Sequence, residues 1–151
     1  MKLKHRGFEI VTAYLGKDIH LPKRNTEHSA GYDFESAIDV LIQPGQTVAV
    51  PTGVKAYMEE GEVLQIFPRS SLSYKRHLTL PNSVGIIDKD YYNNPDNEGH
   101  IHILLWNFGS EPAEIKQGER LAQGIFTKFL TVDDEPSSGA KLLGGFGSTG
   151  R

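Results

Sequence analysis

The chain of 151 residues contains no cysteine. This absence excludes disulfide bonds, zinc–thiolate sites, iron–sulfur clusters and cysteine nucleophiles. Long hydrophobic runs are missing too, because no window approaches the roughly 18 apolar residues of a membrane span. The charged N-terminus is not followed by the apolar stretch of a secretory signal. We therefore expect a cytoplasmic protein that does not contact a membrane.

An excess of positive charge is also missing. The sequence has 16 Lys and Arg residues against 19 Asp and Glu residues, which gives a formal net charge of −3. Proteins that bind duplex nucleic acid usually carry a broad basic surface, so we expect no such partner. A small anionic ligand remains compatible, since a local group of hydrogen-bond donors can hold one phosphate group.

Helical periodicity is nearly absent, whereas glycine (16) and proline (8) are frequent. Short apolar and β-branched segments alternate with turn residues, which is typical of a β-sandwich or barrel. One or two helical turns are expected only at residues 71–77, and Gly124 is a candidate β-bulge. The expected strands cover residues 8–15, 40–42, 47–50, 54–58, 63–67, 83–87, 100–106 and 121–130.

The chain changes composition at residue 133. From there it carries a proline, two adjacent serines and five glycines, four of which lie in the final Gly-Gly-Phe-Gly-Ser-Thr-Gly-Arg. Such a segment cannot pack as an element of its own. We expect one β domain over residues 1–132 and a glycine-rich C-terminal arm over residues 133–151 that closes over a ligand. An unstructured terminus is the alternative interpretation.

Two segments carry residues suited to chemistry. In Pro-Arg-Ser-Ser-Leu-Ser (68–73), Arg69 offers a bidentate donor fork at the start of the expected helical turn, where anions bind well. A serine cap beside a surface arginine explains this segment equally well. In residues 82–92, Asp88 and Asp90 follow an apolar run and share a face if the strand period persists.

An acid in the position of Asp88 can hold a water and act as general base, although solvated acids at an ordinary hairpin end are the alternative. With the polar loop 93–99, the stretch reads as a β-hairpin with an enlarged tip. The next strand begins at His100. His100 and His102 would share a strand face, but no third ligand at a suggestive spacing supports a zinc site.

Five segments in this order resemble the trimeric dUTPase family. They are AGYD (30–33), PRSSLS (68–73), NSVGIIDKDYY (82–92), GERLAQ (118–123) and GGFGSTG (144–150). The resemblance implies an all-β, distorted jelly-roll or barrel-like single domain with one short helix. It implies a homotrimer with active sites at subunit interfaces.

The activity implied is hydrolysis of dUTP to dUMP and pyrophosphate by water attack on the α-phosphorus. That reaction keeps uracil out of DNA and supplies dUMP for thymidylate synthesis. Mg²⁺ is implied as the cofactor, held mainly by the triphosphate.

The resemblance also implies residue roles. Asp88 orients and activates the attacking water and touches the sugar 3′-hydroxyl, and Tyr91 stacks beneath the deoxyribose and excludes a 2′-hydroxyl. Asp33 contacts Mg²⁺ through water, and Gln123 contacts the phosphate or water network with support from Arg120. The remaining assignments are phosphate contacts by Arg69, Ser70 and Ser71, uracil contacts by Asn82, Gly85, Ile87 and His102, and ligand closure by Lys141, Phe146, Gly147, Ser148 and Thr149.

The chain departs from the family pattern in two places. Ser73 stands where the second motif commonly ends in glycine, and Lys141 stands near where an arginine usually precedes the last glycines. A lysine supplies a point charge but no bidentate fork. The loop at residues 93–98 looks like the longer hairpin tip of some bacterial members.

Two other functions stay open at this level. A dCTP deaminase shares this fold, but it needs a glutamate at the base, and residues 82–92 contain none. A catalytically idle nucleotide-sensing module is the other alternative, and the intact Asp88, Tyr91 and Phe146 weigh against it.

Overall fold

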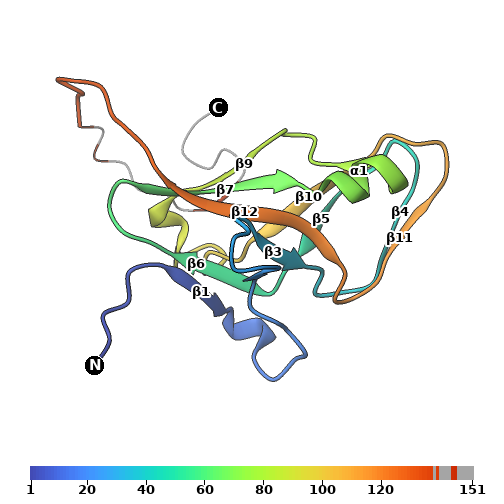
Figure 1. The fold of residues 1–151 in the computed structure, drawn as a ribbon, viewed down its shortest axis with the longest axis horizontal. Helices are drawn as coiled ribbons and strands as arrows, with labels where there is room; N and C mark the ends of the chain where they lie inside the picture. Colours follow the sequence, from blue (N-terminus) through green and yellow to red (C-terminus); the bar gives the residue numbers. More distant parts are fainter. Residues whose placement is uncertain (138, 140–143, 146–151) are drawn as a thin grey trace.

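The computed structural model describes residues 1–137, 139, 144 and 145 (Figure 1). One α-helix, α1 (Ser70–Arg76), and two short 3₁₀ turns, η1 (Thr12–Tyr14) and η2 (Lys89–Tyr91), accompany the strands in this part of the chain. The strands are β1 (Gly7–Ile10), β2 (Lys23–Arg24), β3 (Tyr32–Glu35), β4 (Val40–Ile42), β5 (Thr47–Pro51), β6 (Val54–Tyr57), β7 (Glu62–Pro68), β8 (Leu78–Thr79), β9 (Gly85–Ile87), β10 (His102–Asn107), β11 (Ala113–Ile115) and β12 (Arg120–Lys128).

The strands pair antiparallel in four sheets. The largest has the order β2-β3-β12-β7-β9, and the others are β5-β10-β8, β1-β6 and β11-β4. None of the four closes on itself within the described residues. The expected all-β fold with one short helix is therefore confirmed, as an open arrangement of sheets and not a closed barrel. Figure 1 shows α1 at the end of the molecule that also carries β4 and β11.

The core lies between these sheets and dictates where glycine is needed. Phe34 and Leu64 are fully buried, and β12 passes directly over them. A Cβ added to Gly124 would lie 2.6 Å from Phe34 Cε2 and 3.0 Å from Leu64 Cδ1. The predicted bulge at Gly124 is wrong, because the register shift falls between Arg120 and Ala122. Gly124 is there for close packing.

Most of the expected strands are confirmed at their places. The segment 8–15 is an exception, since β1 ends at Ile10 and the 3₁₀ turn η1 follows. The helix α1 matches the expected turns, and it ends where His77 takes a left-handed conformation with φ 56°. Ser73, the departure from the family pattern, donates its hydroxyl to the Leu78 carbonyl at 3.1 Å.

The predicted hairpin over residues 82–100 is wrong. Strand β9 pairs with β7, with Ile87 opposite Leu64 and Gly85 opposite Ile66. Strand β10 belongs to another sheet, where it pairs with β5 and β8. The η2 turn and the long loop after it redirect the chain, so the two strands do not meet. As a result β9 is an edge strand of the largest sheet.

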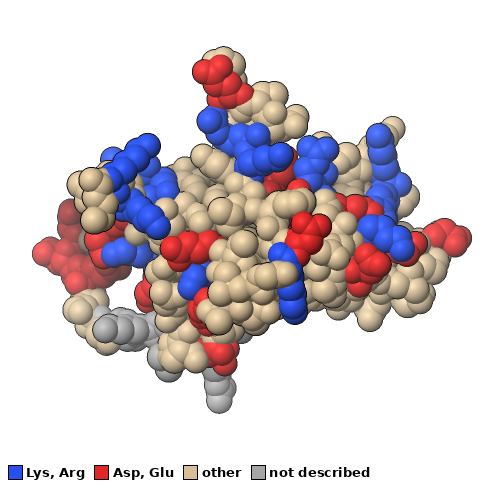
Figure 2. Space-filling view, turned by 90° about the horizontal axis from the view of Figure 1, so that it is seen from below, with Lys and Arg blue, Asp and Glu red and all other residues tan. Residues whose placement is uncertain are grey.

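Two further features concern helix length and the distribution of surface charge. No helix in the described residues is both long and apolar enough to cross a membrane. On the face that Figure 2 shows, basic and acidic side chains are interspersed.

Candidate functional site

A cleft of about 220 Å³ brings together most of the residues predicted to hold phosphate. It forms where β3, the start of α1 and the start of β12 meet, because β12 pairs with β3 on one side and with β7 on the other. We call it the charged cleft. Its lining residues are Asn25, Ser29, Gly31, Asp33, Arg69, Ser70, Ser71, Arg120 and Gln123.

The electrostatics of the charged cleft centre on Asp33, whose side chain is 16% exposed. Arg69 Nε lies 3.7 Å from one carboxylate oxygen of Asp33, and Arg120 Nη1 lies 3.6 Å from the other. Arg69 also donates to the Arg120 carbonyl at 3.3 Å. Two guanidinium groups around one carboxylate leave an excess positive charge, which suits an anionic ligand.

The first turn of α1 adds further donors to the cleft. Arg69 immediately precedes the helix, so the backbone N–H groups of Ser70 and Ser71 have no partner one turn earlier in the helix. Their hydroxyls line the cleft as well. The serine-cap alternative is wrong, because Arg69 stands at the cap position of α1 and the helix has no side-chain cap hydrogen bond.

Gly31 also lines the charged cleft, and the sequence alone did not show why a glycine stands there. A Cβ at this position would lie 2.5 Å from Gln123 Oε1. Glycine therefore leaves room for the amide of Gln123 at the cleft. Asn25 and Ser29 line the cleft too. They precede the first motif in an ordinary polar loop, and nothing in the sequence distinguishes them.

Asp88 lies on a different part of the surface. It follows β9 directly and begins η2, where the Tyr91 N–H donates to its carbonyl at 3.1 Å. It lines a separate cleft of about 540 Å³ together with Glu60, Glu62 and Phe129. Burial raises the pKa of the Asp88 carboxyl, and the charge of Asp90 raises it further. Because β9 ends at Ile87, the strand alternation predicted for the two acids does not continue through them.

Tyr91 is buried, with 7% of its surface exposed. Its hydroxyl donates to the His100 carbonyl at 2.8 Å and accepts from Asn97 Nδ2 at 2.8 Å. The buried Asn94 donates to the Tyr91 carbonyl at 2.7 Å. Burial raises the pKa of the phenol, while the Asn97 hydrogen bond lowers it. We call residues 91–99 the amide-braced turn.

Three of the four residues predicted at uracil, Asn82, Gly85 and Ile87, lie on or just before the edge strand β9, whereas His102 lies on β10 in another sheet. Asn82 is exposed before β9, and Ser83 takes a left-handed φ of 65°. Gly85 sits against Ile66, because a Cβ there would lie 3.1 Å from Ile66 Cβ and 3.7 Å from Asn82 Nδ2. Within the described residues β9 pairs with β7 alone, so its outer backbone edge faces no other strand.

The two histidines are neighbours but form no metal site. Their rings lie 4.2 Å apart between centroids, and His102 Nδ1 is 3.3 Å from the His100 carbonyl oxygen. His100 Nε2 accepts the Gly53 N–H at 2.9 Å. Burial, with the charge of His102, lowers the pKa of His100 to about 4. Within the described residues no three His, Cys, Asp or Glu side chains are arranged so that they could hold a metal ion.

The predicted site is therefore divided into two halves. Among the described residues, those from 82 to 91 do not line the charged cleft. Ile87 pairs with Leu64, and Arg69 comes five residues after Leu64 in the sequence. At the rise of an extended strand, this places Arg69 roughly 16 Å from Leu64. Gly144 and Gly145 lie against the amide-braced turn. Predictions for Lys141, Phe146, Gly147, Ser148 and Thr149 fall outside the described residues.

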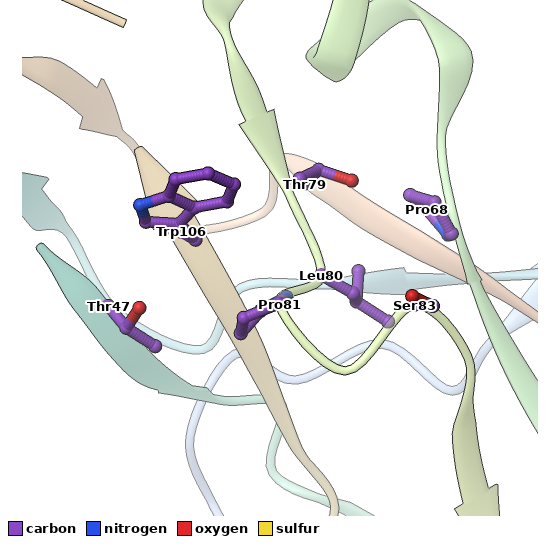
Figure 3. A pocket seen from close by; sticks show the side chains of 7 residues that line it. All are labelled: Thr47, Pro68, Thr79, Leu80, Pro81, Ser83 and Trp106. Atoms are coloured by element: carbon purple, nitrogen blue, oxygen red, sulfur yellow. The ribbon is translucent and has the colours of Figure 1, made fainter. Parts of the chain in front are cut away.

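A third pocket, of about 620 Å³, opens between the ends of the sheets. Figure 3 shows Trp106 on β10 beside it, with Leu80 and Pro81 crossing between Thr47 and Pro68. The lining is largely apolar, and Trp106 is 39% exposed. Its ring lies 5.7 Å from that of Phe108, which is 41% exposed.

Comparisons with known proteins agree on one family. The family model described as dUTPase matches residues 17–150. A protein of Lactococcus lactis subsp. lactis named deoxyuridine 5′-triphosphate nucleotidohydrolase is 55% identical over 149 residues, which covers 98% of this chain and 99% of the relative. A protein of the same name from Methylococcus capsulatus is 36% identical over 149 residues, covering 94% and 95%.

Solved structures give the same result. The crystal structure of a dUTPase from Streptococcus mutans superposes with a TM-score of 0.80 at 52% identity, and covers 84% of this chain and 98% of that one. A mutant dUTPase from phage phi11 of S. aureus, described with a structural Mg(II) ion, superposes at 0.72 with 22% identity, covering 89% and 97%. The second likeness concerns the fold alone.

Proposed function

Because this chain belongs to the dUTPase family, it is a dUTP diphosphatase that hydrolyses dUTP to dUMP, and we propose how its two half-sites divide that reaction. The observation that carries the proposal is the separation of the charged cleft from Asp88 and Tyr91. One half holds the triphosphate, and the other holds the nucleoside and the attacking water.

Asp88 is the general base in this scheme. Its carboxylate orients a water for attack on the α-phosphorus, takes up a proton from it and contacts the 3′-hydroxyl. Its position at the end of β9, and the burial that raises its pKa, support this role. A base with a raised pKa binds a proton more readily than a carboxylate with an ordinary pKa does.

The charged cleft is the triphosphate site. Arg69, Ser70 and Ser71 bind phosphate oxygens, and Gln123 contacts the phosphates or their waters. Such transfer depends mainly on positioning and charge neutralisation.

Mg²⁺ fits this cleft as an ion that the substrate carries. Asp33 is already engaged by Arg69 and Arg120, so it suits contact through water better than direct ligation. When bound, the ion neutralises phosphate charge. The carboxylate oxygens of Asp33 would accept hydrogen bonds from the water shell of the ion, while the arginines remain available to phosphate.

The nucleoside binds along β9. The backbone of Gly85 and Ile87 reads the pairing edge of uracil from the open side of the sheet, with Asn82 and His102 beside the base. The Tyr91 ring lies beneath the deoxyribose and leaves no room for a 2′-hydroxyl. The edge position of β9 supports the first role, and the rigid placement of Tyr91 supports the second.

The working enzyme is a homotrimer whose subunits combine their half-sites. One subunit supplies Asp88 and Tyr91, and a neighbour supplies Arg69 and Gln123. The apolar pocket in Figure 3, with the exposed Trp106, is a surface that a second copy would bury.

The C-terminal arm completes the site. In our proposal residues 1–132 form the catalytic domain and residues 133–151 close over the bound nucleotide. Phe146 covers uracil, while Lys141, Gly147, Ser148 and Thr149 contact the ligand and its γ-phosphate. We place the reaction in the cytoplasm, where it keeps uracil out of DNA and supplies dUMP. A chain ending at Leu143 is expected to fold and trimerise but to lose most turnover.

Pyrophosphate release from dUTP, dCTP, dTTP and UTP tests the activity, with ammonia release from dCTP measured in parallel. We expect turnover of dUTP alone. Ammonia from dCTP would favour a deaminase, and no release from any nucleotide would favour a nucleotide-binding module.

Subunit mixing tests the shared site. Asp88→Asn and Arg69→Ala are each expected to be nearly inactive as pure proteins. After unfolding and refolding together in equal amounts, about a quarter of the interface sites should carry both intact residues, and activity should return. If the mixture stays as inactive as its components although hybrids form, Asp88 and Arg69 act within one chain.

A further inference from the structure

The Tyr91 hydroxyl is held from two sides by groups of its own chain. It donates to the His100 carbonyl at 2.8 Å and accepts from Asn97 Nδ2 at 2.8 Å. The first bond fixes the distance of the ring from the chain segment just before β10. The second fixes its position relative to the loop, so that the phenol oxygen uses both its donor and one acceptor site.

Asn97 is itself fixed before it reaches Tyr91. Its Oδ1 accepts from Asn94 Nδ2 at 2.8 Å and from the Gly99 N–H at 3.1 Å. Asn94 is 5% exposed, and its own Oδ1 accepts the N–H groups of Asp96 and Asn97. The Asn97 amide therefore has one orientation that satisfies its partners, with Nδ2 directed at Tyr91.

The backbone of the loop takes unusual conformations that bring Asn97 to Tyr91. Asn93 and Glu98 take left-handed φ values of 56° and 66°, conformations that cost a non-glycine residue on the order of 1 kcal/mol. Gly99 has φ 88°, and a Cβ there would lie 2.7 Å from the Tyr91 carbonyl oxygen. On the far side Lys55 Nζ binds Asn93 Oδ1 at 2.6 Å and Glu98 Oε2 at 2.7 Å.

The arm meets the same hydroxyl. A Cβ added to Gly145 would lie 3.4 Å from the Tyr91 oxygen, and one added to Gly144 would lie 2.8 Å from Asp96 Oδ2. The loop, the approach to β10 and the described part of the arm thus converge on one phenol oxygen.

We propose that Asn97 is a positioning residue that sets the place of the Tyr91 ring and thereby sharpens the preference for dUTP over UTP. The inference rests on the proposed role of Tyr91 beneath the deoxyribose. To admit a 2′-hydroxyl, the ring must retreat, and retreat strains or breaks the Asn97 bond. The loop at residues 93–98 then serves sugar selection, although none of its side chains touches the sugar.

Asn97→Asp tests the inference with little change of shape. The aspartate keeps an oxygen to accept from Asn94 and Gly99, but it has no N–H to donate to Tyr91. We expect the ratio of kcat/KM for dUTP to that for UTP to fall about five- to tenfold, the usual effect of one lost hydrogen bond. The ratio should fall because UTP is turned over faster, not because dUTP is turned over more slowly. Thermal melting should show that the variant is folded.

A double-mutant cycle with Tyr91→Phe separates positioning from general loop stability. If Asn97 acts through the hydroxyl, Asn97→Asp adds nothing to the loss of selectivity caused by Tyr91→Phe. Additive losses would overturn the inference. Glu98→Gln is the matched control, because it disturbs the Lys55 side of the same loop and should leave the ratio within twofold.

Tyr91→Ala distinguishes the inference from its premise. If Tyr91→Ala loses selectivity while Asn97→Asp keeps the full ratio, Asn97 is not a positioning residue, and the role of Tyr91 stands. If Tyr91→Ala also keeps the full ratio, the sugar is selected elsewhere, and the premise and the inference both fall.

Discussion

The charged cleft and the amide-braced turn are held together by different kinds of interaction. In the charged cleft, Asp33 and two arginines lie 3.6–3.7 Å apart as partly exposed ions. In the amide-braced turn, neutral groups are buried and joined by bonds of 2.7–2.8 Å around Tyr91. The cleft keeps loose ion pairs, whereas the turn is satisfied internally.

This difference matches what each region binds in our proposal. Exposed ion pairs are weak and exchange easily, so Arg69 and Arg120 can turn from Asp33 to phosphate without a large penalty. Buried amide networks are rigid because any member left unpaired is destabilising. The turn is therefore suited to measuring the shape of a sugar, and the cleft to taking up charge.

The largest effect is expected from Asp88→Asn, which removes the base and leaves both regions intact. Turnover of dUTP should fall by about 10³-fold, near the middle of the range for positioned proton transfer, while binding of a non-hydrolysable dUTP analogue persists. Because burial raises the pKa of Asp88, its ionised form destabilises the fold above that pKa. The variant should therefore melt at a higher temperature than the wild type at pH 7.

The same raised pKa shapes the rate profile of the wild type. As pH falls, kcat/KM should decline at a pH above the ordinary carboxylate value of about 4. A profile that stays flat down to pH 4 would remove Asp88 from the role of base.

Arg69→Lys tests the charged cleft. The lysine keeps the charge but loses the fork that reaches both Asp33 and the Arg120 carbonyl. We expect KM for dUTP to rise about ten- to 100-fold with a smaller change in kcat and little change in melting temperature. Arg76→Lys is the control, since Arg76 pairs with Glu119 outside the cleft and should leave KM near the wild-type value.

Asn94→Ala tests the amide-braced turn. It removes one hydrogen bond each from the Tyr91 carbonyl and Asn97 Oδ1, and it leaves the Asp96 and Asn97 N–H groups without their acceptor. The free energy of unfolding, measured in urea, should fall by about 2–4 kcal/mol. The exposed Gln43→Ala serves as control and should change it by less than about 0.5 kcal/mol. A loss equally small for Asn94→Ala would show that the turn is not rigid.

The smallest effect concerns His100, which lies at the end of the turn. Partial burial of the ring and the charge of His102 lower the pKa of His100 to about 4. The neutral ring accepts the Gly53 N–H. The stability from the neutral ring is fully present above the ordinary histidine pKa of about 6.5 and is lost as pH falls towards 4. His100→Gln should flatten the fall in melting temperature over this range, by an amount worth on the order of 1 kcal/mol. Parallel curves for the two proteins would contradict this.

Local patterns in the sequence predicted the local structure well. The helical turn after Pro68 and the strands around it follow from apolar spacing and turn residues, and Arg69, Ser70 and Ser71 share a surface because they are neighbours in the chain. The family resemblance then named the remaining site residues, which spacing alone does not connect.

Non-local structure was harder to predict. The meeting of Asp33 with Arg69 depends on β12 lying between β3 and β7, a register that no single segment encodes. The hairpin prediction failed because the sequence of a long polar loop does not indicate with which sheet the next strand pairs. Asn94 and Asn97 resemble any exposed asparagines in sequence, and only the structure shows that Asn94 is buried and that both side chains are hydrogen-bonded.

Strand β9 leaves one row of backbone donors and acceptors at the open edge of a sheet. In most proteins such a row invites a second chain to add on, and it is kept short or charged. Here the strand has three residues, and Asp88 and Lys89 follow at once. Base recognition along β9 would thus be a truncated form of strand addition, in which a nucleobase takes the place of a neighbouring peptide. The shortness that admits the base also protects this edge against strand addition by another copy of the chain.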